Sequence, residues 1–441
     1  MQLQLPLWKR LLWNVFVACF LPAFLLCALI PGRRQRTYFI WGSVPLINNK
    51  YFSEAIRQAG HRSMTLMAGH YAINARSDFD RYFEDFAPRF LPQALRVALG
   101  GCIAFMFALR RAAVMHMSFN GFTLGSTMFW RLEGALFRLA GAKIVILPFG
   151  SDFYMYSRLL DTSLQHGLLA SYPGKALEEG RVERGVRYWS RRADALVSGM
   201  MVDGIGRWDV TLNQFFCIDT DAWVGKTHYS DHDGKNGPVR ILHTPNHRGF
   251  KGTEFLVDAA ERLKQEGLQL ELVLLEGVPN SQVKQAMAEV DVLAEQFIAT
   301  GYAISGIEGM ASGLPVMANL EHPAYTRVFR RFGFLDECPI FSTTPETVLA
   351  NLRTLVTNPQ LRRTLGEAGR QFAEKYHSYE MARYLFGSIY DKILHGKDVD
   401  LINLFHPLKS DYNRRTPRVS HPLVENQLPP DWRPDGAEPA R

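Results

Sequence analysis

Two cations and two glycines lie close together near the middle of the chain. Arg248 and Lys251 are three residues apart, and Gly249 and Gly252 follow them directly. Arg can bind a phosphate through paired hydrogen bonds, whereas Lys supplies a compact positive charge. The glycines allow a ligand to approach the backbone amides that precede a helix. This spacing predicts a loop that holds a diphosphate, and two solvated surface cations are the alternative.

A carboxylate stands in a glycine-rich motif further along the chain. Glu308 lies in the stretch 305–316, whose pattern predicts a short helix followed by a strand at 314–318. A carboxylate at a helix N-terminus is stabilised by unpaired amides and by the helix dipole. Such a carboxylate can accept hydrogen bonds from both hydroxyls of a ribose. We therefore expect Glu308 to hold a ribose, and a simple helix-terminal charge is the alternative.

Two more polar residues stand at the ends of apolar strand patterns. Asp152 follows the pattern at 143–148, and His116 lies near the end of the pattern at 111–117. Ligands of α/β proteins bind outside the carboxyl ends of parallel strands, so both residues are candidates for a catalytic or orienting role. Capping of the next segment is the alternative for Asp152. Packing in the core is the alternative for His116.

Alternating strand and helix patterns must position these residues. The strand patterns lie at 37–41, 62–67, 111–117, 143–148, 195–198, 239–243, 270–275, 290–295 and 314–318. Alternation with helices predicts parallel sheets covered by helices. We expect two Rossmann-like domains, at 37–224 and 238–396, that face each other across a cleft. A polar linker at 225–237 joins them, and seven prolines after residue 396 predict a poorly ordered tail at 397–441.

An apolar run at 11–30 precedes the first domain. Its one polar side chain is Asn14, and as a helix it would reach about 30 Å, the thickness of a bilayer core. Three interpretations stay open: a spanning anchor, a helix that lies in one leaflet and bends at Pro22, and a buried helix of the soluble fold. The flanking basic residues are Lys9, Arg10, Arg33, Arg34 and Arg36. Because more of them follow the run, we predict a membrane-anchoring segment at 1–36, with the body at the cytoplasmic face of the inner membrane.

Composition narrows the possible partners. The chain has 441 residues and a formal charge of +7, and no stretch of Lys and Arg is dense enough for nucleic-acid binding. A solvated surface, an anionic membrane or an anionic substrate would all suit a mild basic excess. The five cysteines are scattered, which argues against a disulfide framework and against a zinc site. We expect no metal and no nucleic-acid partner.

Together these residues resemble the retaining glycosyltransferases of the large bacterial family 4, which have the GT-B fold. That family has an Arg and a Lys-Gly pair before a helix, then Glu-Ala-Met-Ala-x-Gly-x-Pro-Val. This chain has Arg248, Lys251-Gly252 and then Glu-Gly-Met-Ala-Ser-Gly-Leu-Pro-Val from Glu308. The turn Phe-Gly-Ser-Asp that ends at Asp152 is similar to the family's His-Gly-Ser-Asp. The stretch 218–221 is similar to the family's sequence before the linker, and the resemblance covers about 37–394.

The resemblance implies that Arg248, Lys251 and Gly252 bind the donor diphosphate and that Glu308 binds the donor ribose. Two positions depart from the family pattern. The first glutamate of a pair that the family commonly shows is Thr300 here, and the histidine of the upstream turn is Phe149.

Other groups near the second motif could contact the donor in place of the missing glutamate. A backbone amide between Gly301 and Ser305 could take over that contact, and Gly306 suits close packing against the donor. Asp152, His116 and Glu308 are the candidate catalytic residues.

We therefore expect an α/β protein of GT-B fold that transfers a sugar from a nucleotide-diphosphate donor to a hydroxyl group. The acceptor would be lipid-linked or a polysaccharide, in cell-surface glycan synthesis at a membrane. The resemblance implies retention of configuration and no cofactor, because the departing phosphate itself takes the acceptor proton. Two alternatives stay open. One is a GT-B sugar-nucleotide epimerase, and the other is a degenerate glycosyltransferase that scaffolds a polysaccharide assembly.

Overall fold

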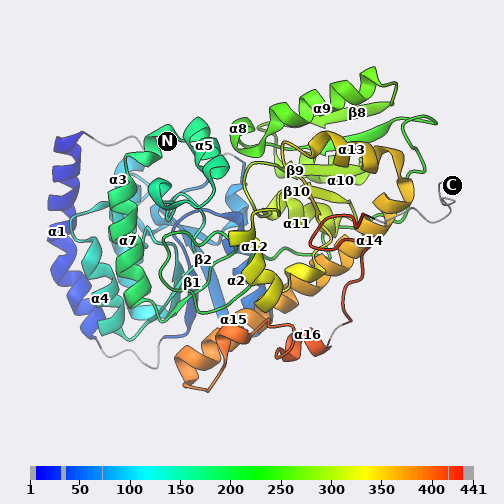
Figure 1. Ribbon diagram of the computed structural model, residues 1–441. Helices are drawn as coiled ribbons and strands as arrows, with labels where there is room; N and C mark the ends of the chain where they lie inside the picture. Colours follow the sequence, from blue (N-terminus) through cyan, green and yellow to red (C-terminus); the bar gives the residue numbers. More distant parts are fainter. Residues whose placement is uncertain (1–5, 31–35, 72, 416, 431–441) are drawn as a thin grey trace.

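Two parallel sheets organise the molecule into two domains that lie side by side (Figure 1). The computed structural model describes residues 6–30, 36–71, 73–415 and 417–430. The first sheet has the strand order β3-β2-β1-β4-β5-β6 and the second has the order β11-β10-β9-β7-β8. Every pairing within the two sheets is parallel. The predicted architecture of two Rossmann-like domains is therefore confirmed.

The strands of the first sheet are β1 (Tyr38–Trp41), β2 (Arg62–Met67), β3 (Arg81–Tyr82), β4 (Ala112–Met117), β5 (Lys143–Ile146) and β6 (Ala195–Leu196). Its helices are α1 (Leu7–Leu29), α2 (Ile47–Gln58), α3 (Gln93–Arg111), α4 (Trp130–Ala140), α5 (Thr162–Ser171), α6 (Pro173–Ala176) and α7 (Glu179–Arg192). Alternate residues of β1 enter different cores, because successive side chains of a strand point to opposite faces. Ile40 packs with α3 and α4, whereas Phe39 and Trp41 pack with α2.

The strands of the second sheet are β7 (Val239–His243), β8 (Leu270–Leu274), β9 (Val292–Gln296), β10 (Val316–Ala318) and β11 (Phe341–Ser342). Its helices are α8 (Arg248–Lys251), α9 (Thr253–Gln265), α10 (Asn280–Glu289), α11 (Ile304–Ala311), α12 (Pro323–Phe332), α13 (Val348–Thr357) and α14 (Pro359–Tyr376). Helix α15 (Tyr379–His395) then returns to the first domain and packs on α2. One apolar core consequently runs through both domains.

Each sheet has a point where the strand order reverses. This switch point lies between β1 and β4 in the first sheet and between β7 and β9 in the second. Helices that follow the two central strands lie on opposite faces there, which leaves a crevice outside the carboxyl ends of the strands. The loops that begin after Trp41, Met117, His243 and Gln296 are therefore the places where a ligand is expected.

The segment after residue 396 is packed against the second domain. It contains η7 (Leu401–Asn403) and α16 (Asp411–Arg415), and Phe405 is fully buried. Further along, Nδ2 of Asn426 donates hydrogen bonds to the carbonyls of Cys338 and Ile340 at 2.7 and 3.2 Å. The prediction of a poorly ordered tail is wrong for the described part of this segment, because prolines end helices without preventing apolar residues between them from packing. Residues 431–441 lie outside the described residues.

Candidate functional site

A buried ion pair stands at the switch point of the second sheet. Lys251, the last residue of α8, places Nζ 2.5 Å from Oε1 of Glu295 and 2.9 Å from Oε1 of Gln296. Both side chains of the ion pair are almost completely inaccessible to solvent. Glu295 and Gln296 end β9, so the predicted phosphate-binding lysine does lie where an α/β sheet binds ligands.

The same carboxylate also reaches the start of α11. Oγ of Ser305 donates to Oε1 of Glu295 at 3.0 Å, and the amide of Ala303 lies 3.4 Å from Oε2. The amide of Gly306 donates to the carbonyl of Ala303 at 3.1 Å. The network joins α8, β9 and α11. Sequence reasoning missed Glu295 and Gln296, although two polar residues that end an otherwise apolar strand were a usable signal.

Arg248 takes part in a separate set of ion pairs. Its Nε lies 2.7 Å from Oε1 of Glu254 and its Nη1 lies 3.0 Å from Oε2 of Glu276. These side chains are exposed, whereas Lys251 is buried. In this conformation the two predicted phosphate ligands thus pair with different carboxylates and do not converge on one position.

Gly249 and Gly252, which follow these cations, allow close packing against neighbouring segments. Helix α8 packs on α5 of the first domain, and the two lie next to each other between the domains (Figure 1). A Cβ on Gly249 would lie 3.4 Å from Cβ of Ala170. Gly252 has φ +76°, and a Cβ there would lie 3.2 Å from Cβ of Phe297. Gly252 is thus required by a left-handed backbone and by a close approach to the loop after β9.

Glu308 is buried inside α11 and not at its N-terminus. The helix begins at Ile304, one turn earlier, and only 4% of the surface of Glu308 is exposed. Nδ2 of Asn280 lies 3.5 Å from its Oε1, at the outer limit of a hydrogen bond. Burial raises the pKa of Glu308 to about 8, although Asn280 and Lys284 act in the opposite direction. The predicted stabilisation by the helix terminus is therefore wrong, and desolvation dominates instead.

The loop between β9 and α11 is held by hydrogen bonds to the end of β9 and to the residue after β10. Thr300, which replaces the glutamate expected from the resemblance, is completely buried. The amide of Gly301 donates to the carbonyl of Asn319 at 2.7 Å, and its carbonyl accepts from Nε2 of Gln296 at 2.8 Å. The amide of Gly301 is thus already used, so an amide that contacts the donor would have to come from another residue of this loop.

His116 is a structural residue of the core. Its ring stacks on the indole of Trp41, with the ring centroids 3.6 Å apart. Nδ1 lies 3.1 Å from the carbonyl of Ile40 and Nε2 lies 2.8 Å from the hydroxyl of Tyr390. Burial lowers the pKa of His116 to about 3, so the ring is neutral and both nitrogens are occupied. Of the two alternatives for His116, the structure shows packing in the core.

Asp152 holds the turn that follows β5. Its Oδ1 accepts hydrogen bonds from the amides of Phe149 and Gly150 at 2.9 and 3.1 Å. Its Oδ2 accepts one from the amide of Phe119 at 3.0 Å. Burial raises the pKa of Asp152 to about 6, even though these amides lower it. Of the two alternatives, the structure shows turn capping for Asp152.

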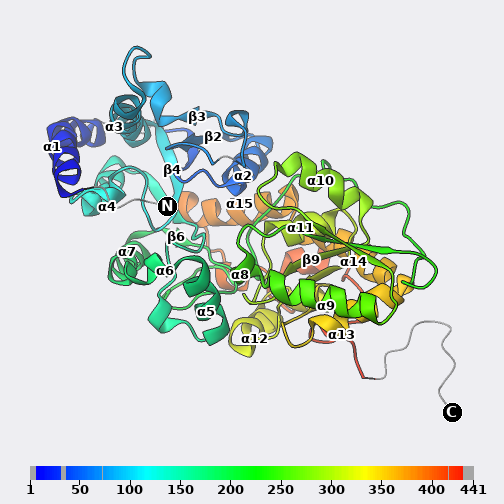
Figure 2. The ribbon, with the colours of Figure 1, turned by 90° about the horizontal axis from the view of Figure 1, so that it is seen from above.

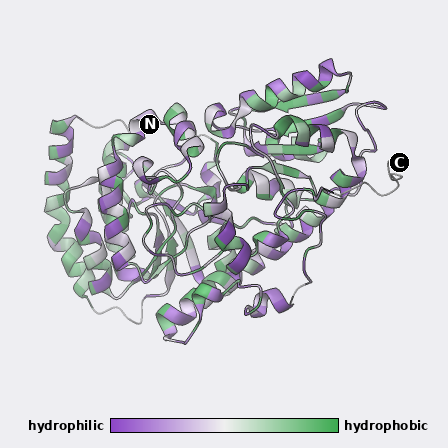
Figure 3. Ribbon diagram, in the orientation of Figure 1, coloured by the Kyte–Doolittle hydropathy of each residue, from purple (hydrophilic) through white to green (hydrophobic). Residues whose placement is uncertain are grey.

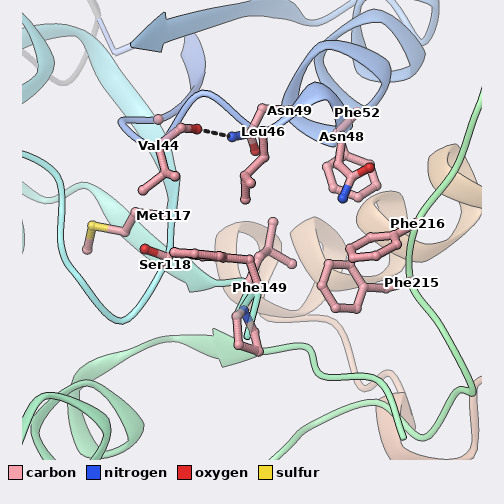
Figure 4. Close-up of a pocket in the computed structure, with 13 residues that line it drawn as sticks. Val44, Leu46, Asn48, Asn49, Phe52, Met117, Ser118, Phe149, Phe215 and Phe216 are labelled. Atoms are coloured by element: carbon pink, nitrogen blue, oxygen red, sulfur yellow. Dashed lines mark hydrogen bonds between the residues drawn. The ribbon is translucent and has the colours of Figure 1, made fainter. Parts of the chain in front are cut away.

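A small apolar pocket lies at the switch point of the first sheet (Figure 4). The start of α2 contributes Leu46 and Asn48, and the opposite side contains Phe149 and Phe215 (Figure 4). Asn48 is nearly buried, and its Oδ1 has no hydrogen-bond partner within the described part of the chain. A buried amide oxygen without a partner is unfavourable and can accept a hydrogen bond from a ligand or a water. Sequence reasoning did not single out Asn48.

The overall arrangement of the chain is similar to that of several solved structures. Neither a protein-family model nor a curated protein matches the chain. A putative UDP-N-acetylglucosamine 2-epimerase from Listeria monocytogenes is similar in structure, with a TM-score of 0.45 and 11% identity over 82% of this chain and 98% of that chain. The catalytic domain of starch synthase IV from Arabidopsis thaliana, bound to ADP and acarbose, has a TM-score of 0.44 and 9% identity over 82% and 100%.

A third similar structure is an alpha-glucosyltransferase in complex with UDP and DNA. It has a TM-score of 0.46 and 11% identity, over 81% of this chain and 99% of that chain. All three TM-scores are below 0.5, so the function proposed below rests on the residues of the chain itself.

Proposed function

We propose that the protein is a glycosyltransferase that moves a sugar from a nucleotide-diphosphate donor to a hydroxyl group. The observation that supports this most directly is the placement of Lys251 and α11 on either side of the carboxyl end of β9. Lys251 supplies the positive charge that a departing diphosphate needs. Glu308, one turn into α11, is the candidate acceptor of hydrogen bonds from the ribose.

Lys251 keeps capacity for an anion although it is ion-paired. A Lys ammonium has three donors, and Glu295 and Gln296 take two of them among the described residues. The third N–H can bind a phosphate oxygen. The contact between α8 and α5 covers this region, so donor binding in our proposal includes a small separation of the two helices.

The reaction we propose retains the anomeric configuration and uses no metal. His116 and Asp152 are held in the core by their hydrogen bonds, so neither is assigned the role of a base. The departing phosphate takes the acceptor proton instead, as the resemblance to glycosyltransferase family 4 implies. Among the described residues no group of three or more His, Cys, Asp and Glu is placed to hold a metal. Metal independence stays a prediction that an assay with chelator will test.

The first domain is the proposed acceptor domain. Its pocket lies at the carboxyl end of the first sheet, and Asn48 offers an unpaired Oδ1 to an acceptor hydroxyl. We propose a lipid-linked or polysaccharide acceptor in cell-surface glycan synthesis, with the enzyme at the cytoplasmic face of the inner membrane. The apolar helix α1 and the basic residues on both sides of it in the sequence suit a position at an anionic membrane surface, and nucleotide sugars are made on the cytoplasmic side.

The test is the fate of a nucleotide sugar that is incubated with the full chain. Slow release of the nucleoside diphosphate, increased by an acceptor, is the expected result. Appearance of an isomeric sugar that is still attached to the nucleotide would assign an epimerase. The existing ion pairs of Arg248 and Lys251 favour one further candidate, a catalytically inactive scaffold. Absence of both turnover and nucleotide binding would establish that candidate and overturn the proposal.

A further inference from the structure

The N-terminal helix α1 is docked on the side of the first domain that faces away from the second domain (Figures 1 and 2). It packs against α3 and α4. In its first half, Oδ1 of Asn14 accepts a hydrogen bond from the amide of Met128 at 2.8 Å. In its second half, the ring of Phe24 packs edge-on against that of Phe105, with the ring centroids 4.9 Å apart. The folded domain therefore holds α1 along most of its length.

The opposite face of α1 is apolar and exposed to solvent. Hydrophobic residues recur along the whole helix (Figure 3). Seven aliphatic side chains on this face are between 47% and 72% exposed: Leu7, Leu11, Leu12, Val15, Leu25, Leu26 and Leu29. On the neighbouring α4, Leu132 and Leu139 are also exposed. Single exposed leucines are ordinary, but a row of them along a 23-residue helix forms an apolar surface that water does not favour.

The exposed charges on the three helices of this surface have one sign. The three helices α1, α3 and α4, described in full, contain seven basic residues: Lys9, Arg10, Arg96, Arg110, Arg111, Arg131 and Arg138. Their one acidic residue is Glu133, which is buried and accepts hydrogen bonds from the amides of Phe122, Thr123 and Leu124. No exposed carboxylate of these helices offsets the cations. The surface is thus complementary to an anionic one.

The packing of α1 is incompatible with a membrane-spanning position. A helix that spans alone is surrounded by lipid over about 30 Å of hydrocarbon. The second helix long and apolar enough to span, α3, packs on both α1 and β4 within the fold. Here α4 lies beside α1, and it carries Arg131 and Arg138 on its exposed face. A transmembrane α1 would draw these guanidinium groups into the hydrocarbon, which is strongly unfavourable.

We propose that α1 lies in the plane of one leaflet of an anionic membrane. Its row of exposed aliphatic side chains, together with Leu132 and Leu139 of α4, enters the boundary between headgroups and acyl chains. Arg131 and Arg138 bind anionic headgroups beside that boundary. This selects one of the three interpretations that the apolar run allows. The proposal does not depend on the reaction, because every contact used here lies on the side of the first domain away from the second (Figure 2).

Flotation of the full chain with lipid vesicles tests the apolar row. We expect the protein to float with vesicles that contain phosphatidylglycerol, and only weakly with phosphatidylcholine alone. The double variant Leu12→Glu/Leu26→Glu changes two side chains that are exposed in the fold and should abolish flotation. The matched control is Leu177→Glu/Leu408→Glu, two exposed leucines outside this surface, which should float normally. Normal flotation of the first variant would overturn the proposal.

A second pair of variants tests the headgroup contacts. Arg131→Gln/Arg138→Gln should weaken binding to anionic vesicles by about thirtyfold, roughly fivefold for each cation, and should reduce its salt dependence. The control Arg327→Gln/Arg331→Gln removes two exposed cations of α12 in the second domain and should bind as the unchanged protein does. Equal losses in both variants would mean that only net charge matters and would contradict the assigned surface.

Two results would contradict the in-plane position of α1 and assign a different role to this face. In vesicles isolated from cells, a protease site placed ahead of Leu7 should be cut in the same vesicle orientation as the body of the protein. Cleavage in the opposite orientation would show that α1 spans the membrane. In lipid-free solution we expect a monomer. A dimer that Leu12→Glu/Leu26→Glu dissociates would assign this face to a second copy of the chain.

Discussion

Nζ of Lys251 lies 2.5 Å from Oε1 of Glu295, and this buried pair fastens α8 to the carboxyl end of β9. A buried ion pair stabilises a fold only modestly, but the loss of one partner leaves an uncompensated charge in the core. The lysine that is proposed to bind the diphosphate thus also contributes to the stability of the fold. Tests of its function must separate these two contributions.

Lys251→Met is expected to lower the free energy of unfolding by about 3–5 kcal/mol, because Glu295 then loses its cation. The double variant Lys251→Met/Glu295→Gln removes both charges and should recover most of this loss. Urea denaturation measures both effects. Neither variant should bind a nucleoside diphosphate in calorimetry. Binding of unchanged affinity by the recovered double variant would exclude Lys251 as a phosphate ligand.

Arg248→Gln is expected to leave the free energy of unfolding almost unchanged, since its ion pairs are exposed. Its affinity for a nucleoside diphosphate should fall by roughly tenfold to a hundredfold, the usual contribution of a hydrogen bond to a charged group. Arg353→Gln is the matched control, because Arg353 forms an equally exposed ion pair with Glu266 in the same domain. The same affinity in both variants would show that Arg248 does not reach the donor.

Glu308 should make stability depend on pH. Its pKa is raised to about 8 from 4.5, so between these values the folded chain keeps a proton that the unfolded chain has lost. The free energy of unfolding therefore falls as the pH rises through this window. The slope is about 1.4 kcal/mol per pH unit where the folded chain binds one proton more than the unfolded chain.

Glu308→Gln should remove this contribution and make the protein more stable than the unchanged chain at pH 7.5, which is about half a unit below the raised pKa. Urea denaturation from pH 5 to pH 8 measures the difference in slope. The exposed Glu346→Gln serves as the control. Parallel pH profiles for Glu308→Gln and the unchanged protein would contradict the raised pKa.

Tyr390→Phe tests the hydrogen bond between α15 and His116 of β4 in the first sheet. The variant leaves Nε2 of His116 buried without its partner, and a loss of about 1–3 kcal/mol in the free energy of unfolding is expected. Removal of the hydroxyl from Tyr71, which is exposed, should have no effect and provides the comparison. A Tyr390→Phe variant as stable as the unchanged chain would mean that a water replaces the hydroxyl.

Local patterns in the sequence were sufficient for the general architecture. Strands alternate with helices because apolar residues recur with matching periods, and that alternation leads to parallel sheets. The same reasoning placed Lys251 in the connection after the strand at 239–243 and Glu308 in the helix before the strand at 314–318, but it did not bring either residue to β9. The helical apolar run of α1 was equally visible.

Long-range contacts decided the rest. His116 was a candidate for catalysis or for the core, and Tyr390, 274 residues away, decides this because its hydroxyl occupies Nε2 of the histidine. Glu295, which no motif marked, proved to be the partner of Lys251 because α8 folds over the end of β9. The sequence by itself thus determined which elements form and in which order the chain uses them. Only the tertiary structure decided which polar groups are buried together, because burial and pairing depend on distant segments that meet in the folded chain.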